Sequence, residues 1–312
     1  MGIEQDITKF LDGIIGACQQ LKSSLHGGPQ PAIAATAVAP PIVVEPAKTP
    51  EEEFQFLKTV LESDNWPEAV NKNLICDPSS DQDKLERGRG IISLVVDDDL
   101  KDKKILDFGC GEGHCAYCAT EQSPSISVGY DLIEHPRWKK FESKENLLLT
   151  SDFGLVTQKG PFDIIVLFDV IDHLKNSTDQ VDILKKMKSV LAPQGKIYMR
   201  CHPLTSRHAT HLYHNLNKAY AHLVFTEEEL RKIVPESIYK ENNISSPYPL
   251  KGYDQIIKDS GLQVFDKSEV REKPEDFFKT PMIADRIKRN TGHKDFPYHQ
   301  MSLQFIDFVL QN

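Results

Sequence analysis

The sequence predicts a doubly wound α/β fold built on a seven-stranded, mostly parallel β-sheet. A glycine-rich turn, residues 107–113, follows a short apolar segment and leads directly into a helix-like run. Downstream, short apolar segments alternate with helix-like stretches at the spacing of repeated strand–helix units. The segment 162–168 is apolar almost throughout, as expected of a central parallel strand that is covered on both faces.

The chain begins with a heptad pattern. Apolar residues recur at alternating intervals of four and three between Ile7 and Leu25, which is typical of a coiled-coil seam. Roughly three heptads are short for an independent coiled coil. We therefore expect residues 1–25 to form an amphipathic association helix that binds a protein partner or self-associates. A helix that packs on the chain's own domain is the alternative.

Residues 26–50 are rich in proline and alanine and are expected to form an extended linker. Regular structure is expected to resume at Thr49, because Thr-Pro-Glu-Glu is typical of a helix start. Helices are predicted over 51–63 and 82–96, the second in a position to cover a ligand. The main domain is predicted to span 51–312, with insertions at about 203–260 and 271–300.

The turn after the first strand reads Asp107-Phe108-Gly109-Cys110-Gly111-Glu112-Gly113. Glycines allow a tight turn and a close backbone approach to a ligand, and the following helix start offers unpaired N–H groups. A second short strand, 126–130, is followed by Asp131, which is placed to accept hydrogen bonds from a ribose diol. The dinucleotide pattern G-x-G-x-x-G fails, because His114 occupies its third glycine position. A dehydrogenase is therefore disfavoured.

This arrangement resembles motif I of the class I S-adenosylmethionine (SAM)-dependent methyltransferases. The resemblance covers residues 82–202 strongly and 250–312 loosely, and it does not reach 1–50. Two apolar segments, 262–270 and 301–310, resemble the sixth strand and the antiparallel seventh strand that close the sheet in that family. An irregularity is expected between Phe305 and Phe308. The sequence also predicts a helix over 178–191 and strands over 146–149, 162–168 and 196–200.

The resemblance implies a SAM site at the carboxyl ends of the strands, where open α/β sheets bind ligands. Asp107 is expected to face the methionine part of SAM and Asp131 to hold the ribose. Asp152 is expected near the adenine amino group, with Phe153 supplying a backbone N–H. The predicted cofactor-binding residues are Asp107, Gly109, Cys110, Gly111, Gly113, Asp131, Leu132, Asp152, Phe153 and Asp169.

The segment from Asp169 to Leu174 resembles an acid-x-x-acid-His-Leu segment of methyltransferases that act on small molecules and, in some cases, on RNA or protein. The sequence has neither the Asp/Asn-Pro-Pro-Tyr/Phe tetrapeptide of DNA amino-methyltransferases nor the Pro-Cys nucleophile of cytosine C5 enzymes at this position. Transfer to an oxygen or nitrogen requires positioning and removal of a proton, for which histidine is suited near neutral pH. Catalytic roles are therefore predicted for Asp169, His173 and His202. A purely structural role of either histidine is the alternative.

Four histidines lie between residues 202 and 214. On a helix, His208, His211 and His214 would share one face. No acidic residue lies within the segment, and hard cations prefer oxygen ligands. We therefore predict no metal site, and expect a polar wall of the acceptor pocket instead. Further contributors to that wall are expected to be Tyr213, Asn215 and Lys218.

The formal net charge of −9 argues against a protein that binds nucleic acid through overall positive charge. The sequence has no apolar run of membrane-spanning length and no signal-peptide pattern, so a cytoplasmic protein is expected. The six cysteines show no disulfide-framework spacing. The leading prediction is a SAM-dependent methyltransferase whose acceptor is unknown. An assembly protein that docks through its first helix and keeps a methyltransferase-like domain is the alternative.

Overall fold

The computed structural model describes residues 49–71, 80–95, 99–174, 176–209, 211–235 and 250–312, which belong to one compact unit. The expected association helix, 1–25, and nearly all of the expected linker lie outside these residues. None of the helices in the described ranges is long and apolar enough to cross a membrane.

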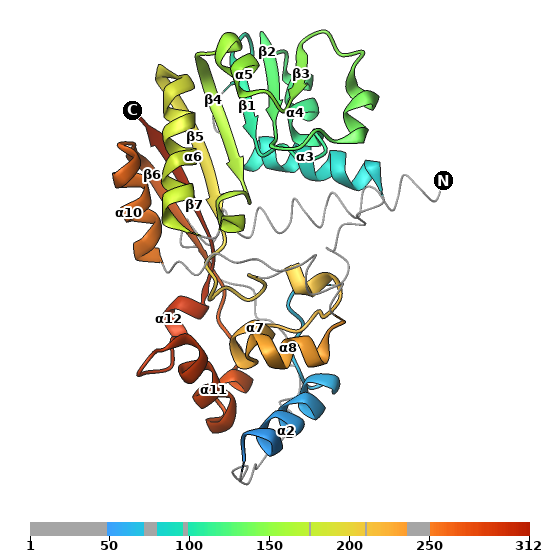
Figure 1. Cartoon of the computed structure of the whole chain (residues 1–312), viewed down its shortest axis with the longest axis vertical. Helices are drawn as coiled ribbons and strands as arrows, with labels where there is room; N and C mark the ends of the chain where they lie inside the picture. Colours follow the sequence, from blue (N-terminus) through green and yellow to red (C-terminus); the bar gives the residue numbers. More distant parts are fainter. Residues whose placement is uncertain (1–48, 72–79, 96–98, 175, 210, 236–249) are drawn as a thin grey trace, which may run out of the picture. The chain divides into compact units, whose positions relative to one another are not determined.

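The described residues contain a seven-stranded sheet with the strand order β3-β2-β1-β4-β5-β7-β6 (Figure 1). Strand β7 runs antiparallel to both of its neighbours, whereas the pairs among β1 to β5 are parallel. The predicted α/β fold with an antiparallel seventh strand is therefore confirmed. The strands are β1 (Lys104–Phe108), β2 (Ile126–Tyr130), β3 (Leu147–Thr150), β4 (Phe162–Phe168), β5 (Leu191–Cys201), β6 (Gln263–Arg271) and β7 (Leu303–Gln311).

Helices cover both faces of the sheet, and β4 shows why its sequence is apolar almost throughout. Ile165 and Leu167 belong to a core cluster that includes side chains of α5, α6 and α10, whereas Ile164 and Val166 belong to a cluster with α3 and α4. Alternate residues of β4 thus enter opposite core layers. The helices are α3 (Asp81–Val95), α4 (His114–Ala119), α5 (Phe153–Lys159), α6 (Ser177–Val190) and α10 (Leu250–Ser260).

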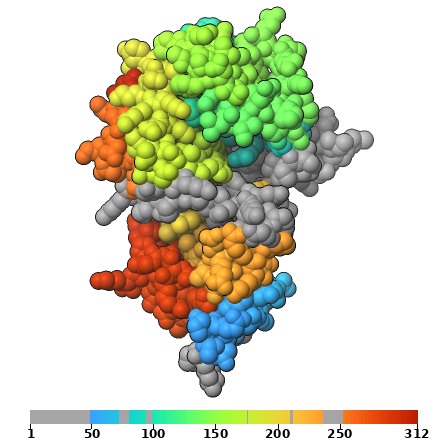
Figure 2. Space-filling model, in the orientation of Figure 1, coloured from blue at the N-terminus to red at the C-terminus, as the bar shows by residue number. Residues whose placement is uncertain are grey.

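A second group of helices, called here the helical lobe, is formed by α2 ahead of the sheet, by the segment after β5 and by the connection between β6 and β7 (Figure 1). Its own apolar core contains Trp66, whose ring lies 5.9 Å from that of Phe225 and 6.0 Å from that of Phe278. In Figure 2, α2 in blue lies against the orange α7–α8 segment. The lobe comprises α2 (Pro50–Glu62), η5 (His211–His214), α7 (Ala221–Val224), α8 (Glu227–Ile233), η6 (Asp276–Lys279), α11 (Pro281–Thr291) and α12 (Tyr298–Met301).

The local start signal at Thr49 is confirmed, because its side chain accepts the N–H of Glu52 at 3.2 Å and Pro50 is the first residue of α2. The irregularity expected between Phe305 and Phe308 lies elsewhere. These residues of β7 pair with β6 in an unbroken register, and the extra residues of this pairing are Phe265 in β6 and Gln304 in β7. Part of the expected insertion 203–260 is α10, which packs against α6 beside the sheet.

Deleting residues 1–48 is expected to change the melting temperature by less than about 3 °C, because α2 carries its own N-terminal cap and packs within the helical lobe. Thermal melts and light scattering of the shortened and full-length proteins provide the measurement. We expect the shortened protein to lose self-association or partner binding. A large drop in melting temperature would instead show that the heptad segment packs on the domain.

Candidate functional site

The three glycines of the turn between β1 and α4 have left-handed backbone, with φ of +80° at Gly109, +51° at Gly111 and +87° at Gly113. A Cβ at Gly109 would lie 2.4 Å from a methyl group of Val170, and one at Gly113 would lie 2.8 Å from Leu149. At Gly111 an added Cβ would meet nothing within 4 Å. The outer glycines are therefore required for packing, and Gly111 is the point where a ligand can approach the backbone.

The backbone of Gly111 is held from two sides. Its N–H donates to Oδ2 of Asp131 at 2.8 Å, and its carbonyl oxygen accepts from Nε1 of Trp138 at 2.8 Å. A carboxylate offers about four acceptor positions, so Asp131 retains capacity for the two hydroxyls of a ribose. Leu132 and Ile133 are 71% and 77% exposed and offer an apolar surface to a flat ring such as adenine. These residues fit SAM.

Asp107 is buried at the end of β1, where its Oδ2 accepts the N–H of Ala116 at 3.1 Å. Gly113 begins α4 and has no side chain to cap it, so Asp107 satisfies one of the unpaired N–H groups of the first turn. Burial raises the pKa of Asp107 to about 7. A cationic ligand group beside it would favour the ionised form.

The substitution Asp107→Asn is expected to weaken the pH dependence of stability. Because the folded-state pKa lies above its ordinary value of 3.8, folding favours the protonated carboxyl, and stability is lost as pH rises through the window up to about 7. Asparagine still accepts the N–H of Ala116 but cannot ionise. Urea unfolding at about pH 5 and about pH 8 should show a smaller loss in the variant than in the wild type. Equal losses would contradict the prediction.

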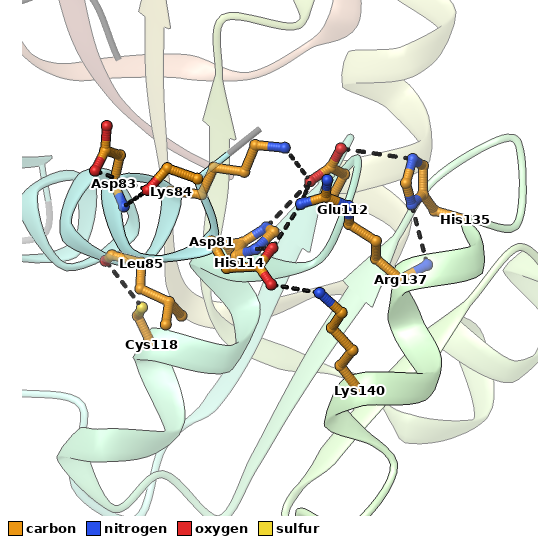
Figure 3. Close-up of polar contacts among 11 residues, drawn as sticks. Asp81, Asp83, Lys84, Leu85, Glu112, His114, Cys118, His135, Arg137 and Lys140 are labelled. Carbon is orange, nitrogen blue, oxygen red and sulfur yellow. Dashed lines mark hydrogen bonds and ion pairs between the residues drawn. The ribbon is translucent and has the colours of Figure 1, made fainter. Parts of the chain in front are cut away.

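Charged side chains surround Glu112, the residue between the second and third glycines (Figure 3). Its Oε2 lies 2.6 Å from Nζ of Lys84 on α3 and 3.4 Å from Nη1 of Arg137 on η3 (Pro136–Phe141). Asp81, the first residue of α3, lies 2.5 Å from the same Arg137. The glycine turn is thus connected to both α3 and η3. Members of this charged cluster are Asp81, Lys84, Glu112, His114, His135, Arg137 and Lys140.

Asp152 and Phe153 lie at the start of α5. Oδ1 of Asp152 accepts the N–H of Gly154 at 2.7 Å and so caps this helix. The ring of Phe153 packs on those of Tyr130 and Phe108 at 5.4 and 6.5 Å. The cap of α5 accounts for the aspartate, and the ring packing accounts for the phenylalanine. The expected contacts of both residues with adenine stay predictions.

The structure brings Asp169, which follows β4, together with His202, which follows β5. Oδ1 of Asp169 lies 2.9 Å from Nε2 of His202, and Oδ2 accepts from Nη2 of Arg87 at 2.9 Å. Burial would raise the pKa of Asp169, but His202 and Arg87 outweigh it and hold this pKa at about 2. Asp169 has left-handed backbone, with φ of +56°.

The pairing determines which nitrogen of His202 can act as a base. Since Nε2 lies 2.9 Å from the ionised carboxylate of Asp169, the neutral ring is expected to carry its hydrogen on Nε2, which leaves Nδ1 as the acceptor. Nδ1 is buried and has no hydrogen-bonding partner among the described residues. Burial alone would lower the pKa of His202, but the Asp169 carboxylate raises it overall. His202 and Asp169 therefore form an acid–imidazole pair suited to general base catalysis.

His173 has a different environment. It ends the short helix η4 (Ile171–His173), and burial lowers its pKa. The histidine ring that lies 2.9 Å from the carboxylate of Asp169 is that of His202, although His173 lies closer in the sequence. His202 is therefore the stronger candidate for the base.

The helical arrangement considered for the histidine-rich segment is wrong. His208 lies outside η5, and its ring packs 5.3 Å from that of His202 and 5.8 Å from that of Tyr213. Burial lowers the pKa of His208 to about 3, so this ring stays neutral. The Nζ of Lys218 donates to the carbonyl oxygen of Ser63 at 2.8 Å, and the expected place of Lys218 in a pocket wall stays a prediction.

The substitution Gly111→Ala is expected to weaken SAM binding at least about tenfold while lowering the unfolding free energy by only about 1 kcal/mol. The Cβ fits the folded protein but occupies the space where the ligand approaches. Gly292→Ala is the matched control, because Gly292 also has positive φ and an open surrounding but ends α11 in the helical lobe. Calorimetry and urea unfolding give the two readouts. Equal SAM affinities in the two variants would contradict this placement of the site.

Comparisons with known proteins extend the geometric findings. A family model described as a methyltransferase domain matches residues 83–237. A ubiquinone biosynthesis O-methyltransferase of Neisseria meningitidis serogroup C is 26% identical over 179 residues, which cover 54% of this chain and 67% of that protein. A tRNA U34 carboxymethyltransferase of Trichodesmium erythraeum is 24% identical over 110 residues, which cover 33% of this chain and 32% of that protein. The chain thus spans between about a third and two thirds of the length of these relatives.

Among solved structures, a SAM-dependent methyltransferase from Mesorhizobium loti aligns with a TM-score of 0.46 and 14% identity. The alignment covers 73% of this chain and 100% of that chain.

Proposed function

We propose, for a chain that belongs to the class I SAM-dependent methyltransferases, that it transfers a methyl group to an oxygen or nitrogen of an acceptor at the carboxyl ends of β4 and β5. The observation that carries this proposal is the Asp169–His202 pair beside the glycine turn. Val170, the residue after Asp169, is the one against which Gly109 packs. The Asp169–His202 pair is therefore adjacent to the glycine turn, residues 107–113.

SAM, when bound, supplies a methyl group on a positively charged sulfur. The contribution of His202 is to accept, through Nδ1, the proton that the acceptor loses. Asp169 holds the opposite nitrogen and stabilises the charge that develops on the ring. A base is useful only when the acceptor carries a proton to lose, so this pair supports an O–H or N–H group. His208 adds a neutral polar surface next to His202.

The relatives suggest the range of acceptors. Their names refer to an O-methylation step of ubiquinone biosynthesis and to uridine 34 of tRNA. We propose for this chain an acceptor group on a small molecule or an exposed group on a macromolecule. Residues 1–25 would then supply contacts with a partner protein or a second copy, which the deletion of residues 1–48 tests.

The decisive experiment incubates the protein with SAM labelled in its methyl group and with fractions of a cell extract. We expect production of the demethylated cofactor and one labelled product, both of which Asp169→Asn should reduce strongly. Calorimetry with SAM and with NAD provides the binding control. Binding of NAD without binding of SAM would overturn the assignment.

A further inference from the structure

The main chain of His202 is held by two buried side chains from other elements. Asp172, in η4, accepts the N–H of His202 through Oδ2 at 2.7 Å. The hydroxyl of Tyr253, on α10, donates to Oδ1 of Asp172 at 2.6 Å and lies 3.4 Å from the carbonyl oxygen of His202. Both oxygens of the Asp172 carboxyl group therefore accept hydrogen bonds. Oδ2 accepts from the main chain of His202, and Oδ1 accepts from Tyr253, whose hydroxyl also lies near the His202 carbonyl oxygen.

The two side chains lie in the protein interior, where hydrogen bonds are electrostatically stronger than in water. Asp172 is 3% exposed and Tyr253 is fully buried in the core cluster between the sheet, α6 and α10. An aspartate in this position is costly to bury, and hydrophobic packing alone does not require it. Its presence is explained if it supports His202, the residue whose backbone N–H it accepts.

We propose that Asp172 and Tyr253 are positioning residues for His202, and that they set both the place and the basicity of its imidazole. The inference rests on the proposed role of His202 as the base. It assigns to α10 a supporting function in catalysis, although this helix packs against α6 and β6 and carries none of the predicted site residues.

The geometric part of the argument concerns the direction of Nδ1. His202 is the first residue after β5, so its backbone is no longer fixed by the sheet ladder. The hydrogen bond from its N–H to Asp172 replaces that constraint. A shift of the backbone would move Nδ1 relative to the acceptor, and such misplacements reduce the rate of transfer strongly.

The electrostatic part concerns the charge of Asp172. Its carboxylate raises the pKa of His202, in addition to the larger effect of Asp169. Burial raises the pKa of Asp172 itself to about 7, and the hydroxyl of Tyr253 opposes this rise. Loss of that hydroxyl would favour neutral Asp172 and so lower the pKa of His202. The other titratable groups that act on His202 or respond to it are Asp169, His173, Arg200 and His208.

The test compares Tyr253→Phe and Asp172→Asn with Tyr220→Phe. Tyr220 is a matched control, because it is also fully buried and its hydroxyl donates one hydrogen bond, to the carbonyl oxygen of Met301 at 2.9 Å in the helical lobe. The full-length protein is labelled on histidine, and the His202 resonances are identified with His202→Gln. The pKa of His202 is then measured by NMR titration.

We expect Tyr253→Phe and Asp172→Asn to lower the pKa of His202 by about 0.5 to 1. The acidic limb of the pH–turnover profile should move down by the same amount, with unchanged SAM affinity. Tyr220→Phe should alter neither quantity, and thermal melts of all three variants show how far each one is destabilised. An unchanged His202 pKa in both site variants would overturn the inference. Failure of the proposed function would give a different result. The wild type would then transfer no methyl group, whereas the two site variants would still lower the pKa of His202 in the NMR titration.

Discussion

Replacing His202 by glutamine is expected to lower turnover at least about tenfold, and losses of a general base are typically 10²–10⁴-fold. The affinity for SAM should change by less than about threefold, because His202 lies after β5 whereas the glycine turn and Asp131 follow β1 and β2. Turnover of the wild type should rise with pH through the raised pKa of His202, since only the neutral ring accepts a proton. Steady-state kinetics over pH, with a labelled methyl donor, gives both quantities.

Three further variants separate catalysis from structure. Asp169→Asn should show a similar loss of turnover, because it removes the carboxylate that orients Nε2 of His202. His299→Ala removes an exposed histidine of the helical lobe and should leave turnover unchanged. His173→Ala tests the other candidate base and should have the smaller effect. Normal turnover in both His202→Gln and His173→Ala would show that positioning alone drives the transfer.

Replacing Asp131 by alanine is expected to weaken SAM binding about ten- to a hundredfold, which corresponds to about 1.5–3 kcal/mol. The carboxylate is placed to accept ribose hydroxyls, and it also fixes the N–H of Gly111. Both contributions are lost in the variant. Isothermal titration calorimetry of the purified protein measures the effect.

The matched control is Asp152→Ala, which removes an acid from the end of the neighbouring strand β3. We expect a smaller loss of SAM affinity there, because Oδ1 of Asp152 is engaged in capping α5. Asp131→Asn retains an acceptor for the Gly111 N–H and should be intermediate. If Asp131→Ala binds SAM as the wild type does, the ribose must lie elsewhere.

Features that depend on local rules could be predicted from the sequence. The cap at Thr49, the turn from Asp107 to Gly113 and the apolar run of β4 each follow from a short stretch of residues with a strong conformational preference. Asp169 and His202 could be selected for a related reason, since both follow strands of a parallel sheet and strand ends meet at one edge.

Contacts between distant segments could not be predicted in the same way. Nothing near Tyr253 in the sequence indicates a bond to Asp172, because the two residues meet only when α10 packs beside the sheet. The same holds for Trp138 and Arg87, whose partners lie on other elements. Lys218 likewise meets the carbonyl oxygen of Ser63, just after α2, although the two residues lie far apart in the sequence.

The left-handed backbone of Asp169 has a consequence for protein engineering. A residue with a Cβ in this conformation costs about 1–2 kcal/mol, and glycine would avoid that cost. Glycine would also remove the carboxylate that His202 and Arg87 hold ionised, and a carboxylate whose pKa is lowered by folding stabilises the folded protein at neutral pH. A library selected at neutral pH for thermal stability alone should therefore retain Asp169, so heat resistance and methyl transfer would be selected in the same direction at this one position.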